Sequence, residues 1–373
     1  MHMNVPFVDL SRQFKPLMPG IQAAINSVIE RNAFINGPEV REFEKHMAGW
    51  IGLPAVCGVS NGTHALALVL EALGIGRGDE VITVPNTAFP TAEAINMSGA
   101  ETVFADIKPG FYNLDPEAAE RAITSKTKAI IPVHLYGIPA DMDSFMRLAE
   151  RYKLYIIEDV AQAQGARYKG RRVGSIGEAG CFSFFPSKNL GTFGDGGAVA
   201  SGNPDLINKV RMLSDHGRLD KFSHVILGTN SRLDTLKAAQ LSICLDHLDE
   251  WNDSRRKTAS LYDELLRPYP EIVRPQVPDG CEAVWHLYVI RYSRRDDLKS
   301  FLNEHGIKTG LHYPLALHRQ PAYGYLGLGD GSFPHAEAAC REVLSLPMFP
   351  FMRTEEVEAV AKAIGLFFEK GGR

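Results

Sequence analysis

A single lysine interrupts the apolar and small residues of CFSFFPSKNLGTFGDGGAV, which spans residues 181–199. A lysine with poor access to water is less stable in its charged form, so its pKa falls, and the neutral amine can attack a carbonyl to form a Schiff base. This chemistry makes Lys188 a candidate nucleophile. The glycines after it favour that interpretation, because backbone without side chains can approach a bulky ligand closely. The alternative is a surface lysine whose stem lies along apolar neighbours.

Two acids follow an apolar run in YIIEDVAQAQGA, residues 155–166. In an open α/β sheet, ligands bind beyond the carboxyl ends of the strands, so Glu158 or Asp159 could contact one there. A helix N-cap or a surface ion pair would explain the same pair of residues.

A third motif, VSNGTHALALVLEAL at residues 59–73, places small polar residues directly before a helical apolar repeat. The unpaired N–H groups and the dipole at a helix start bind phosphate well. Simple capping by Asn61 or Thr63 is the alternative. A lysine amine, a strand-end carboxylate and a phosphate site together match the needs of pyridoxal phosphate, which requires an amine for its aldehyde and an acid for its ring nitrogen.

The elements that must position these residues alternate along the chain. From about Val81, short β-branched runs alternate with longer amphipathic ones, which predicts βαβ units around a mostly parallel sheet covered on both faces. Beyond about Glu250 the pattern changes to helices that flank strands near WHLYVIRY and a Pro/Gly/His-rich loop. We expect a large α/β domain over residues 1–249 and a smaller α+β domain over residues 250–373. The N-terminal segment could pack on the small domain.

Composition excludes several classes of protein. The net charge is −4 and the basic residues are spread along the 373-residue chain, which argues against nucleic acid as a partner. The five cysteines are scattered and form no C-x-x-C pair, so a disulfide framework or a zinc knuckle is not expected. No N-terminal segment has the residue order of a signal peptide, and the longest apolar run of the sequence is too short to span a bilayer. We therefore expect a cytoplasmic protein that binds no metal and no membrane.

The same residues carry a family resemblance. The chain resembles the DegT/DnrJ/EryC1/StrS sugar aminotransferases, which are pyridoxal phosphate enzymes of fold type I, and the similarity runs from VPFVDLSRQF to the last helix. Its most specific motifs are NGTHAL, EDVAQAQGA, FSFFPSKNLGTFGDGGAV and GTNSRLDTLKAAQL. The resemblance implies a large domain with a seven-stranded sheet between helices, and a small C-terminal domain.

The resemblance also implies roles for individual residues. Lys188 would bind the cofactor aldehyde covalently and move protons, Asp159 would pair with the ring nitrogen, and Gln162 would bond the ring hydroxyl. The cofactor phosphate would be bound by Gly62, Thr63 and Ser183. Asn230 resembles an asparagine that reaches the phosphate from the neighbouring subunit, which implies a homodimer with shared active sites. The chain departs from the family at TAFPT, where Ala88 replaces the usual aromatic residue over the ring, so either Ala88 or Phe89 would cover it.

On the substrate side, LHYPLALHRQPAYGYLG resembles the loop of members that aminate carbon 3 of a nucleotide-linked 3-keto-6-deoxyhexose. His312 and Tyr313 would contact the sugar or its diphosphate, while His318 could be a ligand or a structural side chain. We expect a ping-pong transamination with glutamate as donor and a dTDP-linked sugar as acceptor. A 4-keto or UDP-linked sugar is the alternative substrate.

Other functions fit less well. A same-fold dehydratase that uses pyridoxamine phosphate usually has histidine at the lysine position. A nicotinamide oxidoreductase is suggested only by GIGRGDE, where the glycines follow a helix instead of a strand. A non-catalytic regulatory relative would not need the lysine, the acid and the phosphate site together. A metal hydrolase would need ligand spacing such as H-E-x-x-H, which does not occur in the sequence.

Overall fold

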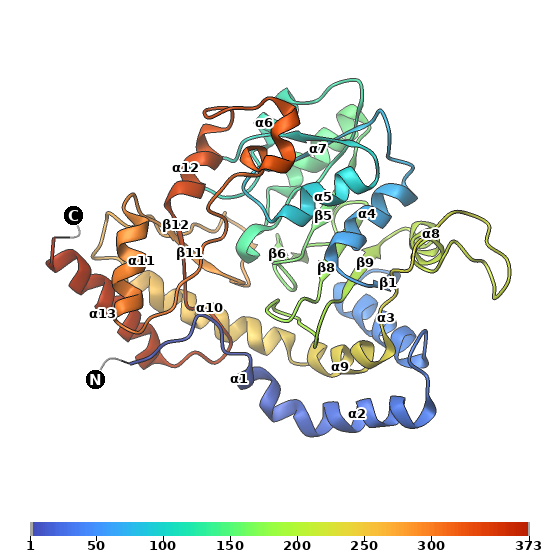
Figure 1. Cartoon of the computed structure of the whole chain (residues 1–373), viewed down its shortest axis with the longest axis horizontal. Coiled ribbons are helices and arrows are strands. Elements are labelled where there is room, and N and C mark those ends of the chain that lie inside the picture. Colours follow the sequence, from blue (N-terminus) through green and yellow to red (C-terminus); the bar gives the residue numbers. More distant parts are fainter. Residues whose placement is uncertain (1–2, 372–373) are drawn as a thin grey trace.

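The computed structural model describes residues 3–371, and its centre is a seven-stranded sheet (Figure 1). The strand order is β1-β9-β8-β5-β4-β2-β3. The strand β9 is antiparallel to both of its neighbours, and every other neighbouring pair is parallel, so six strands run in one direction. The bounds are β1 (Ala55–Val59), β2 (Glu80–Thr83), β3 (Glu101–Phe104), β4 (Thr127–Ile130), β5 (Tyr155–Asp159), β8 (Ala179–Ser183) and β9 (Gly197–Ser201).

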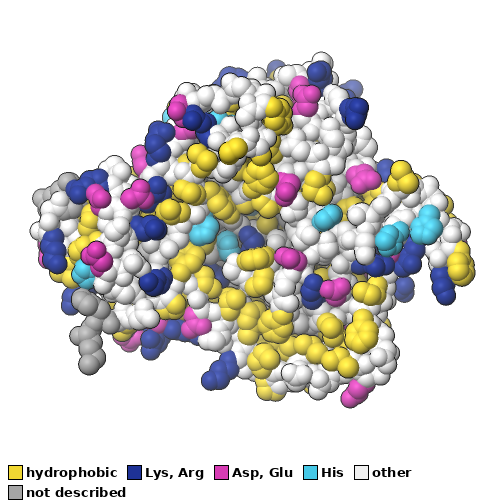
Figure 2. Space-filling model, viewed as in Figure 1, with side chains coloured by type: hydrophobic (Ala, Val, Ile, Leu, Met, Phe, Trp, Pro, Cys, Tyr) yellow, Lys and Arg dark blue, Asp and Glu magenta, His cyan; other side chains and the backbone are white. Residues whose placement is uncertain are grey.

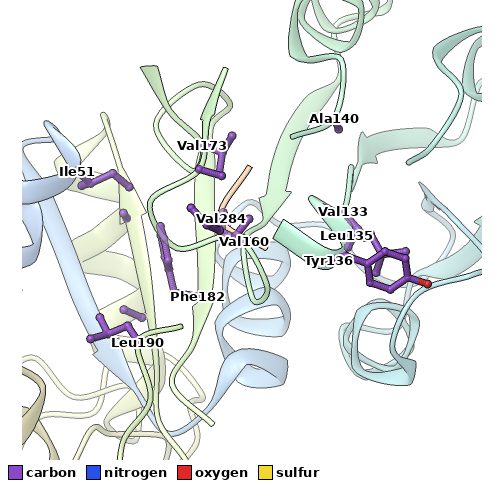
Figure 3. Close-up of a cluster of buried hydrophobic side chains, with 14 of the residues drawn as sticks. Ile51, Val133, Leu135, Tyr136, Ala140, Val160, Val173, Phe182, Leu190 and Val284 are labelled. Atoms are coloured by element: carbon purple, nitrogen blue, oxygen red, sulfur yellow. The ribbon is translucent and has the colours of Figure 1, made fainter. Parts of the chain in front are cut away.

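Both faces of this sheet are buried. Neighbouring residues of one strand belong to different cores: Ile156 and Phe182 lie in one, while Ile157 and Cys181 lie in the other. Side chains alternate across a sheet, so this division shows that helices cover each face. Figure 3 shows Phe182 in the first core with Leu190 and other side chains. The covering helices are α3 (Pro38–Ile51), α4 (Gly62–Ala72), α5 (Phe89–Met97), α6 (Pro116–Arg121), α7 (Met142–Tyr152), α8 (Pro204–Ser214) and α9 (Thr235–Leu245).

The C-terminal part has its own hydrophobic core. It is built on an antiparallel pair, β11 (Tyr288–Arg291) and β12 (Val343–Leu346), with the helices α11 (Arg295–Glu304) and α13 (Thr354–Glu369). The helix α12 (Pro334–Glu342) follows in the same part of the chain, but its buried Ala336 and Ala339 belong to the first core. The three remaining short strands form a separate sheet: β6 (Arg167–Tyr168), β7 (Arg171–Arg172) and β10 (Cys281–Glu282). The α/β class, the mostly parallel seven-stranded sheet and the smaller α+β part are confirmed.

One long helix joins the two cores. The helix α10 (Leu248–Leu265) contributes Leu248 and Trp251 to the first core and Ala259 and Tyr262 to the C-terminal core. The boundary at residues 249 and 250 therefore falls within the first turn of this helix. The division of the chain into two domains at that point stays a prediction.

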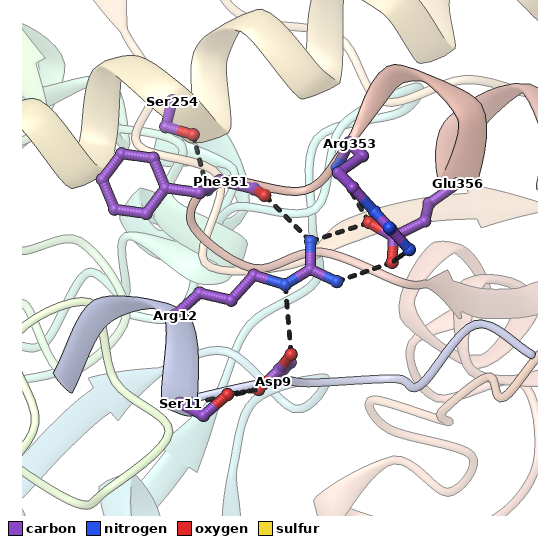
Figure 4. A network of polar contacts seen from close by, with 7 residues as sticks. All are labelled: Asp9, Ser11, Arg12, Ser254, Phe351, Arg353 and Glu356. Carbon is purple, nitrogen blue, oxygen red and sulfur yellow. Dashed lines mark hydrogen bonds and ion pairs between the residues drawn. The ribbon is translucent and has the colours of Figure 1, made fainter. Parts of the chain in front are cut away.

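The N-terminal segment lies against the C-terminal part. Val5 pairs with Ile307 through a β-bridge, and Arg12 forms two hydrogen bonds, 2.6 and 2.7 Å long, with the carboxylate of Glu356 (Figure 4). The helices α1 (Ser11–Phe14) and α2 (Met18–Arg31) then continue along the large sheet's side, where Phe14 and Ile21 enter the first core. No helix between residues 3 and 371 combines the length and the apolar character that crossing a bilayer requires.

Candidate active site

The two adjacent acids at the end of β5 have different surroundings. Glu158 is fully buried, pairs with His134 at 3.0 Å and accepts the amides of Gly174, Ile176 and Gly177 at 2.7 to 2.8 Å. Burial alone would raise its pKa, but these bonds lower it below the ordinary value. All of its acceptor capacity serves the fold, so Glu158 is a structural residue.

Asp159, the next residue, holds its carboxylate at the carboxyl end of the sheet. Its Oδ2 accepts the hydroxyl of Thr91 at 2.8 Å, and its Oδ1 accepts the amide of Ala161 at 3.0 Å. Both bonds leave lone pairs on the carboxylate for a ligand. The side chain is nearly buried, so a cation bound beside it would be stabilised more strongly than in water.

Lys188 lies in the loop that connects β8 to β9. Its amide donates to the carbonyl of Phe185 at 2.8 Å, which closes a tight turn after the strand. Lys188 as a whole is partly exposed, but protein atoms around the amine shield it from water. Burial lowers the pKa of Lys188 to about 8, although the nearby charge of Asp159 acts in the opposite direction. The amine is therefore neutral in an appreciable fraction of molecules near neutral pH, as nucleophilic and acid–base roles require.

The start of α4 lies directly beside the end of β8. A Cβ on Gly62 would lie 2.8 Å from the Cβ of Ser183, so only glycine allows this approach. Asn61 caps the helix by accepting the amide of His64 at 2.8 Å. The amides of Gly62 and Thr63 have no acceptor within residues 3–371 and stand next to the Ser183 hydroxyl, which is a suitable arrangement for an anion.

Gln162 connects this region to the C-terminal loop. Its Oε1 accepts the amide of Tyr136 at 2.7 Å, and its Nε2 donates to the hydroxyl of Tyr313 at 3.1 Å. Burial raises the pKa of Tyr313 to about 12, so the phenol stays protonated. Burial, with a further contribution from the charge of Lys188, lowers the pKa of His312 to about 4, which keeps this ring neutral.

The two remaining residues that the sequence predicts at the cofactor are Ala88 and Asn230. Ala88 is partly exposed and precedes α5, three residues before Thr91, whereas the ring of Phe89 lies 5.7 Å from that of Tyr323. Phe89 thus packs against the C-terminal loop. Asn230 is exposed, and its backbone pairs with Asp215 in a β-bridge. Its neighbour Ser231 bonds Ser60 at 2.8 Å, so the chain near Asn230 runs past the start of α4.

The comparison with protein families decides the identity of the fold. Residues 18–365 match the model of the DegT/DnrJ/EryC1/StrS aminotransferase family. The chain belongs to this family. It is an aminotransferase, and the pyridoxal phosphate that the family uses is its cofactor.

Similarity to individual proteins extends over nearly the whole aminotransferase. A pleiotropic regulatory protein of Geobacillus stearothermophilus is 45% identical over 98% of this chain and 99% of its own length. The dTDP-3-amino-3,4,6-trideoxy-alpha-D-glucose transaminase of Streptomyces venezuelae is 44% identical over 98% of this chain and 97% of its own length. The crystal structure of S. venezuelae DesV superposes with a TM-score of 0.96, at 44% identity over 98% of this chain and 99% of that one.

The donor groups of the site fit pyridoxal phosphate. Free helix-start amides suit its phosphate, a carboxylate suits its ring nitrogen, and a poorly hydrated amine suits its aldehyde. Lys188, Asp159, Gln162, Ser183 and Gly62 come from separate segments that the carboxyl ends of β5 and β8 and the start of α4 bring together. The candidate substrate residues His312 and Tyr313 lie within electrostatic or hydrogen-bond reach of Lys188 and Gln162.

The sequence did not indicate several residues that shape this site. Thr91 stands in the TAFPT motif, but only the contact at 2.8 Å reveals its bond to Asp159. Tyr136 and Asn189 have no feature in the sequence that indicates a role in the site. His318, left open by the sequence, is buried and bonds Glu337 at 3.1 Å, so it is a structural side chain.

Proposed function

We propose that this aminotransferase transfers the amino group of glutamate to carbon 3 of a dTDP-linked 3-keto-6-deoxyhexose, giving the dTDP-3-amino-3,6-dideoxyhexose. The observation that carries this proposal is the 44% identity, over nearly the full length of both chains, to a transaminase whose name specifies an amino group on carbon 3 of a dTDP sugar. The loop over residues 311–327, which resembles that of 3-aminating relatives, supports the same position.

Each predicted residue then has a defined task. Bound pyridoxal phosphate supplies a ring that withdraws electrons from the carbon next to the transferred nitrogen. Asp159 keeps a proton on the ring nitrogen, and Gln162 bonds the ring hydroxyl. Gly62, Thr63 and Ser183 hold the phosphate, and Ala88 or Phe89 would cover the ring. These tasks agree with the free amides at α4 and with the partial pKa shift of Lys188.

Lys188 is the acid and base of the reaction. The Nζ atom would carry a proton from the α carbon of glutamate to the cofactor and, in the second half of the cycle, from the cofactor to carbon 3 of the sugar. An amine with a pKa of about 8 can do both near neutral pH. His312 and Tyr313 orient the sugar or its diphosphate. The lowered pKa of His312 keeps its ring neutral there, and the phenol of Tyr313 is protonated.

The substrate proposal is tested with glutamate and a panel of dTDP- and UDP-linked 3-keto and 4-keto sugars, by following cofactor absorbance and product mass. We expect an amino sugar from the dTDP-linked 3-keto substrate and none from Lys188→Ala. Conversion of only 4-keto sugars would reject the position, and a product that has lost water without gaining nitrogen would indicate a dehydratase. No turnover of any sugar would favour a regulatory role, as the name of the Geobacillus relative suggests.

We propose that the enzyme is a homodimer in which Asn230 of the partner subunit reaches the phosphate of each site. The loop between α8 and Asn230 supports this, because it extends from the body at the right of Figures 1 and 2 and exposes apolar side chains. Leu227 is 93% exposed and Phe222 is 82% exposed. Large exposed apolar side chains on one projection are typical of a surface that another chain covers.

Complementation between two inactive variants tests the shared site. Lys188→Ala and Asn230→Ala should each lose activity alone. In a hybrid dimer, one of the two sites combines an intact lysine with an intact asparagine from the other chain, so mixing and refolding the variants should restore part of the activity. If the mixture stays inactive while hybrid dimers form, Asn230 does not act across the interface.

A further inference from the structure

The residue after Lys188 is held by a buried polar network. Asn189 is fully buried, and its Nδ2 donates to Oδ1 of Asn252 at 2.8 Å and to the carbonyl of Val284 at 3.0 Å. Its Oδ1 lies 3.2 Å from Nδ1 of His286. Asn252 belongs to α10, whereas Val284 and His286 precede β11. The loop that carries the lysine is thus tied to two elements outside the large sheet.

These contacts define which nitrogen of His286 carries the hydrogen. A carbonyl can only accept, so the amide nitrogen of Asn189 must face Val284 and the amide oxygen must face the histidine ring. The oxygen also only accepts, so Nδ1 of His286 is the donor. Burial lowers the pKa of His286 well below its ordinary value, and the charge of Lys188 lowers it further, so the ring is neutral and Nε2 keeps its lone pair.

The backbone around His286 is tightly held. Nη1 of Arg255 donates to the carbonyls of Trp285 and His286, both at 3.2 Å. The amide of Val284 donates to the carbonyl of Gly137 at 3.0 Å. A Cβ on Gly137 would lie only 2.9 Å from the amide nitrogens of Trp285 and His286, so the two segments are in direct backbone contact. The imidazole therefore projects from a segment that cannot shift without losing several contacts.

We propose that His286 is a positioning residue for Lys188. By donating from Nδ1 to Asn189, it fixes the backbone that follows the lysine and hence the direction in which the amine projects. A neutral ring also avoids a second cation beside that amine. The inference rests on the proposed role of Lys188, and it places one determinant of the lysine's position in the segment before β11, outside the motif that contains the lysine.

Two substitutions at the same position separate this bond from simple packing. His286→Asn puts an amide nitrogen near the place of Nδ1 and can still donate to Asn189, whereas His286→Gln puts its amide near Nε2 and leaves Asn189 without a donor. His318→Asn is the matched control, because His318 is also buried, at 2% exposed, but bonds Glu337 in another part of the fold. The measurement is the rate at which apoprotein attaches pyridoxal phosphate covalently, read as mass after borohydride reduction.

We expect the attachment rate to fall about ten-fold in His286→Gln, because the buried oxygen of Asn189 is left without a donor, and to stay within about two-fold of the parent in His286→Asn and His318→Asn. An unchanged rate in His286→Gln, or equal losses in the Asn and Gln variants, would overturn the inference. If the variants do not fold, the ¹⁵N spectrum of labelled histidine in the unaltered protein decides, since a hydrogen on Nε2 of His286 would also overturn it.

The Lys188→Ala variant separates this inference from the proposed function. If Lys188→Ala still forms the reduced adduct, another residue binds the cofactor and the proposed role of Lys188 fails. If that variant loses the adduct while His286→Gln attaches the cofactor at the parent rate, only the positioning role of His286 fails.

Discussion

At the scale of single residues, the fold changes the ionisation of Lys188. Its pKa falls from the ordinary 10.5 to about 8. Between these values the unfolded chain binds more protons than the folded apoprotein, so the free energy of unfolding rises with pH from about 8 to 10.5. The full contribution of this one group is about 3 kcal/mol. At pH below 8 both states hold the proton, and the folded state bears the whole cost of burying the charge.

Urea unfolding of the apoprotein over this pH range, for the parent and for Lys188→Met, measures the effect. The variant has no amine to bury, so it should be the more stable of the two below pH 8 and should lose that advantage as the pH approaches 10.5. Subtracting the two curves removes the titration of tyrosines and other groups. A difference that does not vary with pH would mean that the amine is well hydrated in the folded protein.

At the scale of elements, the loop between β8 and β9 must keep its path for the lysine to point correctly. Gly191 packs against the backbone of Pro186, which lies on the other side of Lys188 in the same loop. A Cβ at position 191 would lie 2.4 Å from the carbonyl oxygen of Pro186. Gln240 on α9 secures the same stretch, accepting the Thr192 hydroxyl at 2.5 Å and donating to the carbonyl of Gly191 at 3.1 Å. The carbonyl oxygen of Pro186 belongs to the backbone, so it cannot rotate away from a Cβ at position 191.

Gly191→Ala should therefore distort the loop, lower the free energy of unfolding by about 1 to 3 kcal/mol and reduce the fraction of protein that binds cofactor. Gly202→Ala is the control, because a Cβ at that position, just after β9, meets nothing within 4 Å. Thermal unfolding and cofactor absorbance measure the two effects. Equal behaviour of the two variants would show that the loop adapts without cost.

The same loop shows what the sequence could and could not predict. Alternating apolar runs are a local signal, so β5, β8 and the helix after Gly62 could be placed from their own residues. The direction of β9 was not predicted, although the glycine-rich connection lacks the helix that a crossover between parallel strands would need. The partners of the site were also hidden, since Thr91 stands 68 residues from Asp159 and His286 stands 97 residues from Asn189. Contacts between residues so far apart in the chain produce no periodic pattern in the sequence from which they could be predicted.

At the scale of the whole molecule, the two ends of the chain are joined beside the candidate substrate residues. Phe7 stacks on His312 with 5.6 Å between ring centres, and the N-terminal segment that carries it is anchored by Arg12 on Glu356. The side chain of Glu356 is only 2% exposed. Its hydrogen bonds from Arg12 lower the pKa of Glu356 to about 2. This ion pair is therefore a structural contact between the segment and α13, unlike pairs on the open surface.

Arg12→Met should lower the free energy of unfolding by about 2 kcal/mol at neutral pH, because it leaves a buried carboxylate with fewer donors. A lowered carboxyl pKa stabilises the fold above its ordinary value of 4.5, and that stabilisation is lost as the pH falls toward 2. The difference between parent and variant should shrink over that interval. Amide hydrogen exchange should also quicken in the N-terminal segment before it changes in the sheet.

Arg151→Met is the matched control for this prediction. Arg151 pairs with Glu120 at 2.8 Å, but its side chain is 69% exposed, so its loss should cost less than about 1 kcal/mol and leave the N-terminal segment unchanged. If Arg12→Met were no more costly than this control, the segment would be held by Val5 and its other contacts. Phe7 would then keep its place on His312 without the ion pair, and the C-terminal helix would have no part in shaping the substrate side of the site.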